Sequence, residues 1–354
     1  MPRALVTGAN GFVGATLCRK LVEQGVNVRA LVRRTSDLSL LQGVPVEQVV
    51  GALEERGSLL EATRGVEVVY HVAAAVTDWG ELAYFRRVNV EGTRHVLEAA
   101  AENRAQRFVY VSSVAVHSFI GAQDMDERSP QRPTPFPYCQ SKREAEALVL
   151  AYHRQGRISV TIARPGDVYG PGDRVSLLGF APLLERGRMA TIGGGNRLGA
   201  FAYVENLADG LILAGTRAEA VGETYVITDG AKLTWRAYFE KLAAALDRPG
   251  PRFSVPPGPA YAVAALLEAT YRLLRIQHRP PITRYLVAHL SKDFHFSIAK
   301  AQRELGYEPR VGVDEAIRRT AAWYRAVVRG EKTISIGDVP PSNGRHNPRA
   351  RAAG

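Results

Sequence analysis

The chain has 354 residues, of which 46% are hydrophobic and 23% are charged, a composition that excludes global disorder and is typical of a folded globular protein. Its net charge of +11 comes mostly from arginines scattered among acids, which argues against nucleic-acid binding. An anionic ligand or an acidic membrane surface would explain the excess of positive charge equally well. Two cysteines, Cys18 and Cys139, exclude a disulfide framework, and without a His/Cys cluster of zinc spacing we expect a reducing, metal-free interior.

Strands and helices alternate through the first half of the chain. Apolar runs predict strands at 4–6, 28–32, 46–50, 68–72, 108–112 and 159–163, and amphipathic stretches predict helices at 12–24, 57–64, 81–102 and 138–154, with a helix or turn at 36–42. This alternation indicates βαβ units and a parallel sheet covered on both faces, the doubly wound α/β (Rossmann) fold. The first strand begins too early to leave room for a signal peptide, so we expect a cytoplasmic protein.

The regular alternation weakens after about residue 170. A glycine turn at 193–196, a strand at 221–228, a helix at 234–246 and a proline cluster at 249–259 follow. We therefore predict three parts. They are a dinucleotide-binding domain over 1–170 with returning segments from about 199–230, a smaller interleaved substrate lobe over 171–330, and an extended or disordered basic tail over 331–354.

A glycine-rich turn joins the first strand to the first helix. Gly8, Gly11 and Gly14 form a T-G-x-x-G-x-x-G array in the stretch TGANGFVG. Glycine lets the chain turn sharply and lets a pyrophosphate approach the backbone, while the helix N-terminus offers free N–H groups to anionic oxygen. In this strand-to-helix context the array predicts dinucleotide binding, the alternative being a tight structural turn.

The end of the second strand carries basic residues where the adenosine ribose is normally recognised. Arg33 and Arg34 follow the strand, and the first acid is Asp37. Because guanidinium pairs well with a 2′-phosphate whereas an acid accepts from ribose hydroxyls, NADP(H) is favoured over NAD(H). The alternative is that both arginines are merely solvated.

A phenol and an ammonium lie four residues apart in YCQSK, at Tyr138 and Lys142. This spacing places them on one helix face, where the lysine cation favours ionisation of a phenol that is otherwise a poor base at neutral pH. Ser112 and Ser113 end the strand at 108–111, where strand ends open onto a cofactor cleft, and a hydroxyl there can hold a substrate carbonyl.

With these motifs the chain resembles the extended short-chain dehydrogenase/reductase superfamily, of the NAD-dependent epimerase/dehydratase type. The resemblance covers most of residues 3–330 in family order: TGANGFVG (7–14), HVAA (71–74), NVEGT (89–93), YVSS (110–113), YCQSK (138–142), ARPGDVYGPGD (163–173) and GAFAYVENLADG (199–210).

The resemblance implies roles for particular residues. Tyr138 would be the catalytic acid/base, Lys142 would hold the nicotinamide ribose and lower the tyrosine pKa, Ser113 would orient the substrate, and Asn89 would support the lysine region. Residues that would contact the cofactor are Gly8, Gly11, Phe12, Val13, Gly14, Arg33, Leu53, Ala73, Ala74, Tyr138, Lys142, Pro165, Gly166 and Val168.

Two departures from the family pattern narrow the function. Gly51-Ala52-Leu53 replaces a usual Gly-Asp-Leu, so only the Leu53 contact with adenine carries over. Val114-Ala115 stands where nucleotide-sugar dehydratases carry an Asp-Glu pair that works on the sugar, which argues against dehydration.

The C-terminal region indicates the branch. Residues 279–309 resemble the branch of 3β-hydroxysteroid dehydrogenases, sterol-4α-carboxylate 3-dehydrogenases and 2-alkyl-3-ketoacid reductases, and VRALVRRTSD (28–37) is similar to reductases of the dihydroflavonol type. Residues 259–276 are apolar and form either a buried helix, a substrate lid or a helix on a membrane surface. Trp79, His117 and Tyr169 are further candidates for substrate contact, packing being the alternative for each.

We therefore expect an NAD(P)-dependent oxidoreductase that interconverts a secondary alcohol and a ketone on an apolar substrate: a 3β-hydroxysteroid, a 4-carboxysterol or a 3-hydroxy/3-keto lipid. The alternative is a nucleotide-sugar 4-epimerase with tightly bound NAD, and a third hypothesis is a non-catalytic dinucleotide sensor. The family commonly pairs subunits through the helices expected at 81–102 and 138–154, so a homodimer is expected.

Overall fold

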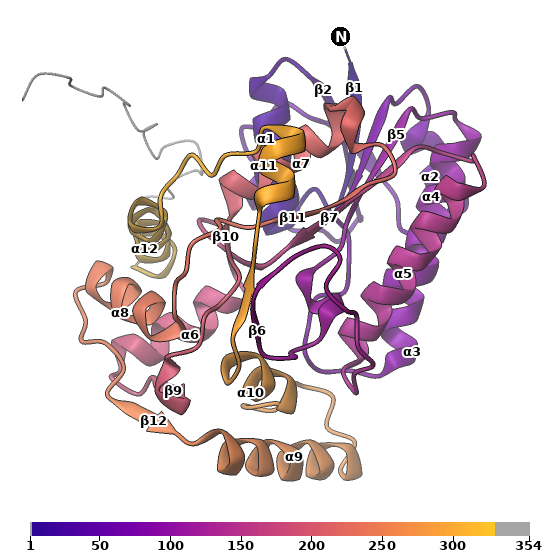
Figure 1. Ribbon diagram of the computed structural model, residues 1–354. Helices are drawn as coiled ribbons and strands as arrows, with labels where there is room; N and C mark the ends of the chain where they lie inside the picture. Colours follow the sequence, from indigo (N-terminus) through magenta and orange to yellow (C-terminus); the bar gives the residue numbers. More distant parts are fainter. Residues whose placement is uncertain (1, 330–354) are drawn as a thin grey trace, which may run out of the picture.

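The computed structural model describes residues 2–329 and contains a central sheet of seven parallel strands (Figure 1). The strand order is β11-β7-β5-β4-β1-β2-β3. The strands are β1 (Arg3–Thr7), β2 (Asn27–Val32), β3 (Glu47–Val50), β4 (Val68–His71), β5 (Arg107–Val111), β7 (Val160–Pro165) and β11 (Thr224–Ile227). The predicted doubly wound α/β fold is confirmed.

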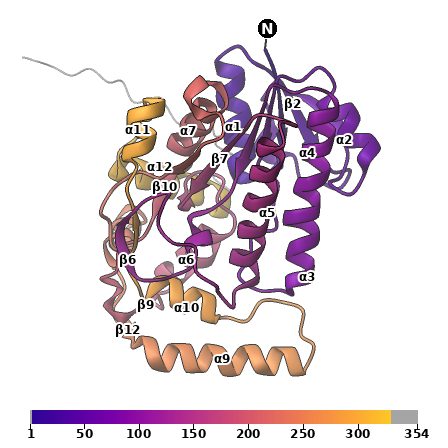
Figure 2. The same ribbon diagram turned by 45° about the vertical axis from the view of Figure 1, so that its right-hand side comes forward.

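Helices cover both faces of this sheet (Figure 2). One face carries α1 (Phe12–Glu23) and α7 (Val204–Thr216), and the other carries α2 (Arg56–Thr63), α4 (Gly92–Glu102) and α5 (Pro137–Arg154). Each helix buries a stripe of apolar residues against strands that are themselves apolar on both sides, as a sheet covered on two faces requires.

The chain leaves β1 toward β2 and β3 on one side and later returns to build β4, β5 and β7 on the other. β1 and β4 are therefore neighbours at the point where the strand order reverses, which is where open parallel sheets bind their ligands. The glycine-rich turn follows β1 at this point.

The stretch at 81–102, predicted as one helix, is divided. It consists of α3 (Leu82–Phe85), a π-helical segment (Arg86–Glu91) and α4. Asn89 in the π-helical segment accepts from the Ala75 N–H (2.7 Å) and donates to the Ser141 hydroxyl (3.0 Å). The wide π turn thus aims a buried amide at the loop after β4 and at the start of α5.

The second lobe has a separate apolar core that includes Trp235 and Tyr238. It is built from α6 (Ser176–Glu185), β9 (Ala190–Ile192), α8 (Trp235–Ala245), β12 (Phe253–Val255), α9 (Pro257–Leu273), α10 (Arg284–Leu290) and α12 (Val313–Arg329). Short segments connect the lobe to the large sheet: β6 (Ala122–Met125), β8 (Asp167–Tyr169), β10 (Phe201–Tyr203), β13 (Phe294–Phe296) and α11 (Ala299–Leu305). The sequence pattern did not predict α6 or α7.

Segments from the second half of the chain return to the first. β11 pairs with β7 at the edge of the central sheet, and α7 packs on the sheet face that also carries α1. The division at residue 170 remains our proposal, and the predicted tail at 331–354 lies outside the described residues.

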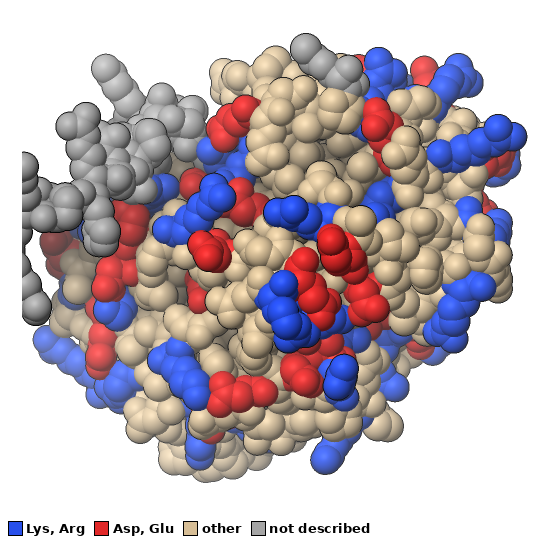
Figure 3. Space-filling view, turned by 45° about the horizontal axis from the view of Figure 1, so that its top comes forward, with Lys and Arg blue, Asp and Glu red and all other residues tan. Residues whose placement is uncertain are grey.

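Charged side chains are mixed on the surface. On the face shown in Figure 3, basic and acidic groups lie next to one another, in keeping with the ion pairs that join elements across the surface. No helix within residues 2–329 combines the length and the apolar character needed to cross a membrane.

Candidate active site

The glycine-rich turn after β1 packs so closely that side chains at Gly8 and Gly14 would meet neighbouring backbone. Gly8 has φ +66°, and a Cβ there would lie 2.9 Å from the Ala73 backbone; a Cβ on Gly14 would lie 2.1 Å from the Gly8 carbonyl oxygen. Gly11 precedes α1, which no side chain caps. The first N–H groups of α1 are therefore available to a pyrophosphate, and this cradle fits the dinucleotide that the sequence predicts.

A buried hydrogen-bond relay holds the loop after β4 against this turn. Thr93 donates to the Asn89 carbonyl (2.6 Å) and so accepts from His71 Nε2 (3.0 Å), which leaves His71 Nδ1 to accept from Thr7 (2.8 Å). Thr7 in turn accepts from the Ala73 N–H (3.2 Å). Burial lowers the pKa of His71 to about 3, so the ring is neutral and serves as a structural link.

In the part of the chain that the structure describes, no carboxylate at the end of β2 is free to bind the ribose hydroxyls in the way that NAD-binding proteins use, because Asp37 already has partners. Asp37 forms an ion pair with Arg174, and the Ser39 N–H donates to its carboxylate (2.9 Å). The Ser39 hydrogen bond and then the Arg174 guanidinium lower the pKa of Asp37 to about 2. Arg33 is exposed, and within the described residues its side chain has no ion pair.

Tyr138 and Ser113 meet at the carboxyl end of β5. Tyr138 lies in the first turn of α5 and is only 8% exposed. Burial raises the pKa of its hydroxyl, and a hydrogen bond with the Ser113 side chain partly offsets the rise. Ser113 also accepts from the Ala115 N–H (3.1 Å), which orients its hydroxyl. Tyr138 therefore keeps its proton at neutral pH, and Lys142 is not among the groups that shift its pKa, so the expected lowering by the lysine is not seen.

Lys142 lies one turn further along α5 and is 2% exposed. Its Nζ donates to the Val111 carbonyl (2.9 Å) and lies 5.1 Å from the centre of the Tyr110 ring. Burial lowers the pKa of Lys142 to about 8, and the Glu146 charge opposes this effect. Glu146 itself forms a buried ion pair with Arg164 (2.7 Å). The ammonium is thus held at the strand end that also carries Ser113.

The other predicted cofactor contacts lie at the ends of strands and at the start of α1, or on the loops beside them. Pro165 ends β7, Gly166 follows it, and Val168 lies in β8; the Asp167 N–H donates to the Ala200 carbonyl (2.6 Å) and fixes this segment. Leu53 is half-buried against α4, and its carbonyl lies 2.7 Å from His95 Nδ1. Phe12 and Val13 are half-buried at the start of α1.

The three candidate substrate contacts have different surroundings. His117 is fully buried and accepts from Arg164 (3.1 Å), and burial lowers its pKa to about 4. Tyr169 is 3% exposed and donates to Asp229 (3.1 Å) in the core of the second lobe. Both side chains therefore already have buried hydrogen-bond partners, as the packing alternative expects. Trp79 is half-buried and packs against Tyr271 of α9.

An aromatic wall that the motifs did not predict surrounds Tyr138. Tyr285, from α10, lies with its ring centre 6.4 Å from that of Tyr138, 5.3 Å from Phe136 and 4.8 Å from Phe119. Phe85 contacts Tyr138 from the other part of the chain (6.3 Å). The only sequence signal for Tyr285 was its position in the family-like stretch 279–309, because a distant lobe brings it to the site.

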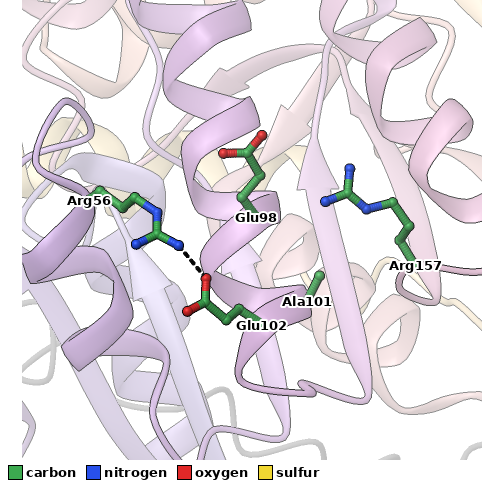
Figure 4. Close-up of a pocket in the computed structure, with 5 residues that line it drawn as sticks. All are labelled: Arg56, Glu98, Ala101, Glu102 and Arg157. Atoms are coloured by element: carbon green, nitrogen blue, oxygen red, sulfur yellow. Dashed lines mark hydrogen bonds and ion pairs between the residues drawn. The ribbon is translucent and has the colours of Figure 1, made fainter.

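A surface hollow of about 410 Å³ lies away from this site (Figure 4). Arg56, Glu98, Ala101, Glu102 and Arg157 line it, and Arg56 pairs with Glu102 (2.5 Å). It lies at the carboxyl end of α4, whereas the residues around Tyr138 lie near the beginning of that helix. Within residues 2–329 no three His, Cys, Asp or Glu side chains gather closely enough to hold a metal ion.

The parallel sheet with a glycine turn at its switch point, and a Tyr-Lys helix beside the strand end that carries Ser113, define an extended short-chain dehydrogenase/reductase. The model of the NAD dependent epimerase/dehydratase family matches residues 4–228, and the chain belongs to this family.

Curated relatives match nearly the whole chain. The 2-alkyl-3-oxoalkanoate reductase of Stenotrophomonas maltophilia (strain K279a) is 33% identical over 90% of this chain and 98% of its own. The 3-beta-hydroxysteroid dehydrogenase of Mycolicibacterium neoaurum is 31% identical over 91% of each chain. The resemblance stated from the sequence motifs is confirmed.

Among solved structures, DesIV, a dTDP-glucose 4,6-dehydratase from Streptomyces venezuelae with NAD bound, has a TM-score of 0.74 and 26% identity, covering 93% of this chain and 98% of that one. Together with the named reductase and dehydrogenase relatives, the family identifies the protein as an NAD(P)-dependent oxidoreductase that interconverts CH–OH and carbonyl groups.

Proposed function

We propose that the enzyme uses NADP(H) to interconvert a secondary alcohol and a ketone on an apolar substrate, of the 3β-hydroxysteroid, 4-carboxysterol or 3-hydroxy/3-keto lipid class. The observation that carries the proposal is the meeting of Tyr138, Ser113 and Lys142 at the end of β5 beneath the aromatic wall of Phe119, Phe136 and Tyr285. Aromatic side chains of this kind suit a hydrocarbon skeleton that presents one oxygen.

In the reducing direction, Ser113 and Tyr138 donate hydrogen bonds to the ketone oxygen. The bound nicotinamide would supply hydride to the carbonyl carbon. Tyr138 transfers its proton to the oxygen as the carbon–oxygen double bond becomes single, and the alcohol is formed. Lys142, one helical turn from Tyr138 in α5, would hold the ribose, and its positive charge would stabilise the phenolate until solvent returns the proton.

The substrate class is tested by following absorbance of the reduced nicotinamide with 2-alkyl-3-keto acids, 3β-hydroxysterols, 4α-carboxysterols and UDP-sugars. The proposal expects turnover with an apolar ketone or alcohol and none with a UDP-sugar. Epimerisation of a UDP-sugar without added cofactor, by protein that copurifies with NAD, would instead support the 4-epimerase alternative. Val114-Ala115, in place of an acid pair, argues against dehydration.

The preference for NADP(H) rests on Arg33, which is exposed, and on Asp37, whose carboxylate is already paired with Arg174. In Arg33→Ala we expect the Kd for NADPH to rise roughly tenfold or more, because a charged hydrogen bond to phosphate is lost. The Kd for NADH, which has no 2′-phosphate, should change less than about twofold, and fluorescence titration measures both. Equal weakening of the two cofactors would contradict the assignment.

We propose a homodimer formed through α4 and α5, as the family resemblance implies. Ala147 is exposed on α5, and Arg at this position would place an unpaired cation between closely packed helices. Light scattering at micromolar concentration should show a dimer for the wild type and a monomer for Ala147→Arg. Ala218→Arg, at another exposed alanine, is the matched control and should remain dimeric. A monomeric wild type would refute the proposal.

The remaining finer expectations stay predictions. These are a cytoplasmic location and peripheral contact of residues 259–276 with a membrane.

A further inference from the structure

Helix α9 exposes its large apolar side chains and buries two alanines and a glutamate. Ala260, Ala264 and Glu268 form the buried side. Glu268 is paired with Arg284, accepting from the backbone N–H (2.7 Å) and from the side chain (2.8 Å). Leu266 and Leu273 are 69% and 82% exposed. A helix packed on a globular protein normally has the opposite arrangement, so the expectation of a buried helix at 259–276 is wrong.

The exposed apolar surface extends beyond the two leucines. Half of the large hydrophobic side chains exposed within residues 2–329 lie between 253 and 274. We call the following set the α9 ridge: Phe253, Val263, Leu266, Leu273 and Leu274. Residues 263, 266 and 273 repeat at helical spacing and lie on one face. Clustered exposure of this kind marks a contact surface.

The chain segment that carries the α9 ridge is basic, and in the described chain the one acid from elsewhere that forms an ion pair with its arginines or lysines is Asp78, on Arg279. Across residues 248–292 the only acid is Glu268, which is buried, and the bases are Arg248, Arg252, Arg272, Arg275, Arg279, Arg284 and Lys292. A second copy docked symmetrically through the same ridge would bring two basic surfaces together. Anionic headgroups would neutralise the arginines while the leucines enter the acyl boundary, the arrangement of an interfacial helix.

The end of α9 is tied to the loop that follows β4. Trp79 packs on Tyr271 (6.2 Å between ring centres) and lies 5.4 Å from the Arg272 guanidinium. Arg279 forms an ion pair with Asp78 (2.5 Å). The same loop carries Ala73, which lies against the glycine turn. Figures 1 and 2 show α9 projecting along one side of the second lobe, apart from α4 and α5. The C-terminal end of α9 is therefore joined by direct contacts to the loop after β4, which packs against the glycine turn.

We propose that the α9 ridge docks the enzyme on an anionic lipid surface. The proposed function explains only why docking would be useful, because an apolar substrate partitions into a membrane. The docking itself does not depend on that function. The leucines supply apolar burial, and the flanking arginines supply attraction to the headgroups.

The test is cosedimentation of the full chain with phosphatidylcholine vesicles that contain or lack phosphatidylglycerol, at low and high salt. We expect the wild type to bind the anionic vesicles roughly tenfold more tightly than the neutral ones, with affinity falling as salt rises. The double variant Leu266→Glu with Leu273→Glu should lose at least about tenfold in binding to anionic vesicles. Val221→Glu, an exposed apolar position (39%) elsewhere, is the matched control and should bind as the wild type does.

Because all three substituted positions are exposed, thermal unfolding of both variants should match the wild type, which separates docking from folding. Failure of the wild type to bind anionic vesicles, or full binding by the double variant, would overturn the proposal. A change of oligomeric state in the double variant would assign the ridge to a second copy. If the wild type does not bind vesicles and the double variant has a raised KM for a water-soluble ketone, the α9 ridge would instead be part of a substrate lid. Vesicle binding requires no turnover, so its outcome is independent of the proposed reaction.

Discussion

Replacing Tyr138 by Phe is expected to lower kcat by about 10²–10⁴-fold, the usual contribution of general acid catalysis. The ring should stay in place, because its contacts with Phe85 (6.3 Å) and Tyr285 (6.4 Å) involve no hydroxyl. The Kd for NADPH should therefore change less than about twofold, because the phosphate cradle around Gly8 is untouched. Steady-state kinetics and fluorescence titration measure the two quantities.

The matched control is Tyr152→Phe, on the same helix. Its hydroxyl donates to Glu98 (3.0 Å) on the side of α5 that packs toward α4, so its loss should leave kcat within about twofold. A Tyr138→Phe variant that keeps more than a tenth of the wild-type kcat would show that another group carries the proton. Unfolding of both variants should remain cooperative, which excludes a general loss of structure.

Replacing Lys142 by Met is expected to remove most activity and to stabilise the cofactor-free protein near neutral pH. Burial lowers the pKa of Lys142 from 10.5 to about 8. The unfolded chain therefore binds more protons than the folded one between these values, so the free energy of unfolding of the wild type rises with pH across this window. Below pH 8 the full cost of the buried charge, on the order of 3 kcal/mol, is present.

Urea unfolding of both proteins between pH 7 and pH 10.5 measures this effect. The advantage of Lys142→Met should be largest at pH 7 and should shrink as pH rises, because the wild-type lysine becomes neutral in both states. Lys241→Met, at an exposed lysine paired with Asp314, is the control and should show no comparable trend over this window. An advantage of constant size across the whole range would refute the assignment of a buried ammonium.

The activity of Lys142→Met should fall by at least about 10²-fold in kcat/KM, because the variant would lack the charge one turn from Tyr138 and the proposed contact with the ribose. A buried charge such as the Lys142 ammonium lowers the stability of the free protein and is expected where the reaction needs that charge. Binding of the cofactor should narrow the stability difference between the two proteins, since Lys142 then gains partners.

Much of the fold, the glycine turn and the Tyr138–Lys142 pair could be predicted from the sequence, because these features depend on patterns within a few residues. Strand-helix alternation up to residue 165 follows from apolar periodicity, and the cradle follows from the spacing of Gly8, Gly11 and Gly14 within one turn. Tyr138 and Lys142 share a helix face by spacing alone. Their distances to the cofactor remain predictions.

Tertiary structure decided what depends on residues far apart in the chain. Arg174 pairs with Asp37, which lies 137 residues earlier in the chain, and Tyr285 contacts Tyr138 from the second lobe. Periodicity marks the apolar side of α9 but does not say whether a partner covers it. In the folded chain that side is exposed, while Glu268 on the opposite side is buried and pairs with Arg284. Local propensity and spacing act within a few residues, whereas burial, charge pairing and exposure are properties of the packed chain, and only the folded protein determines them.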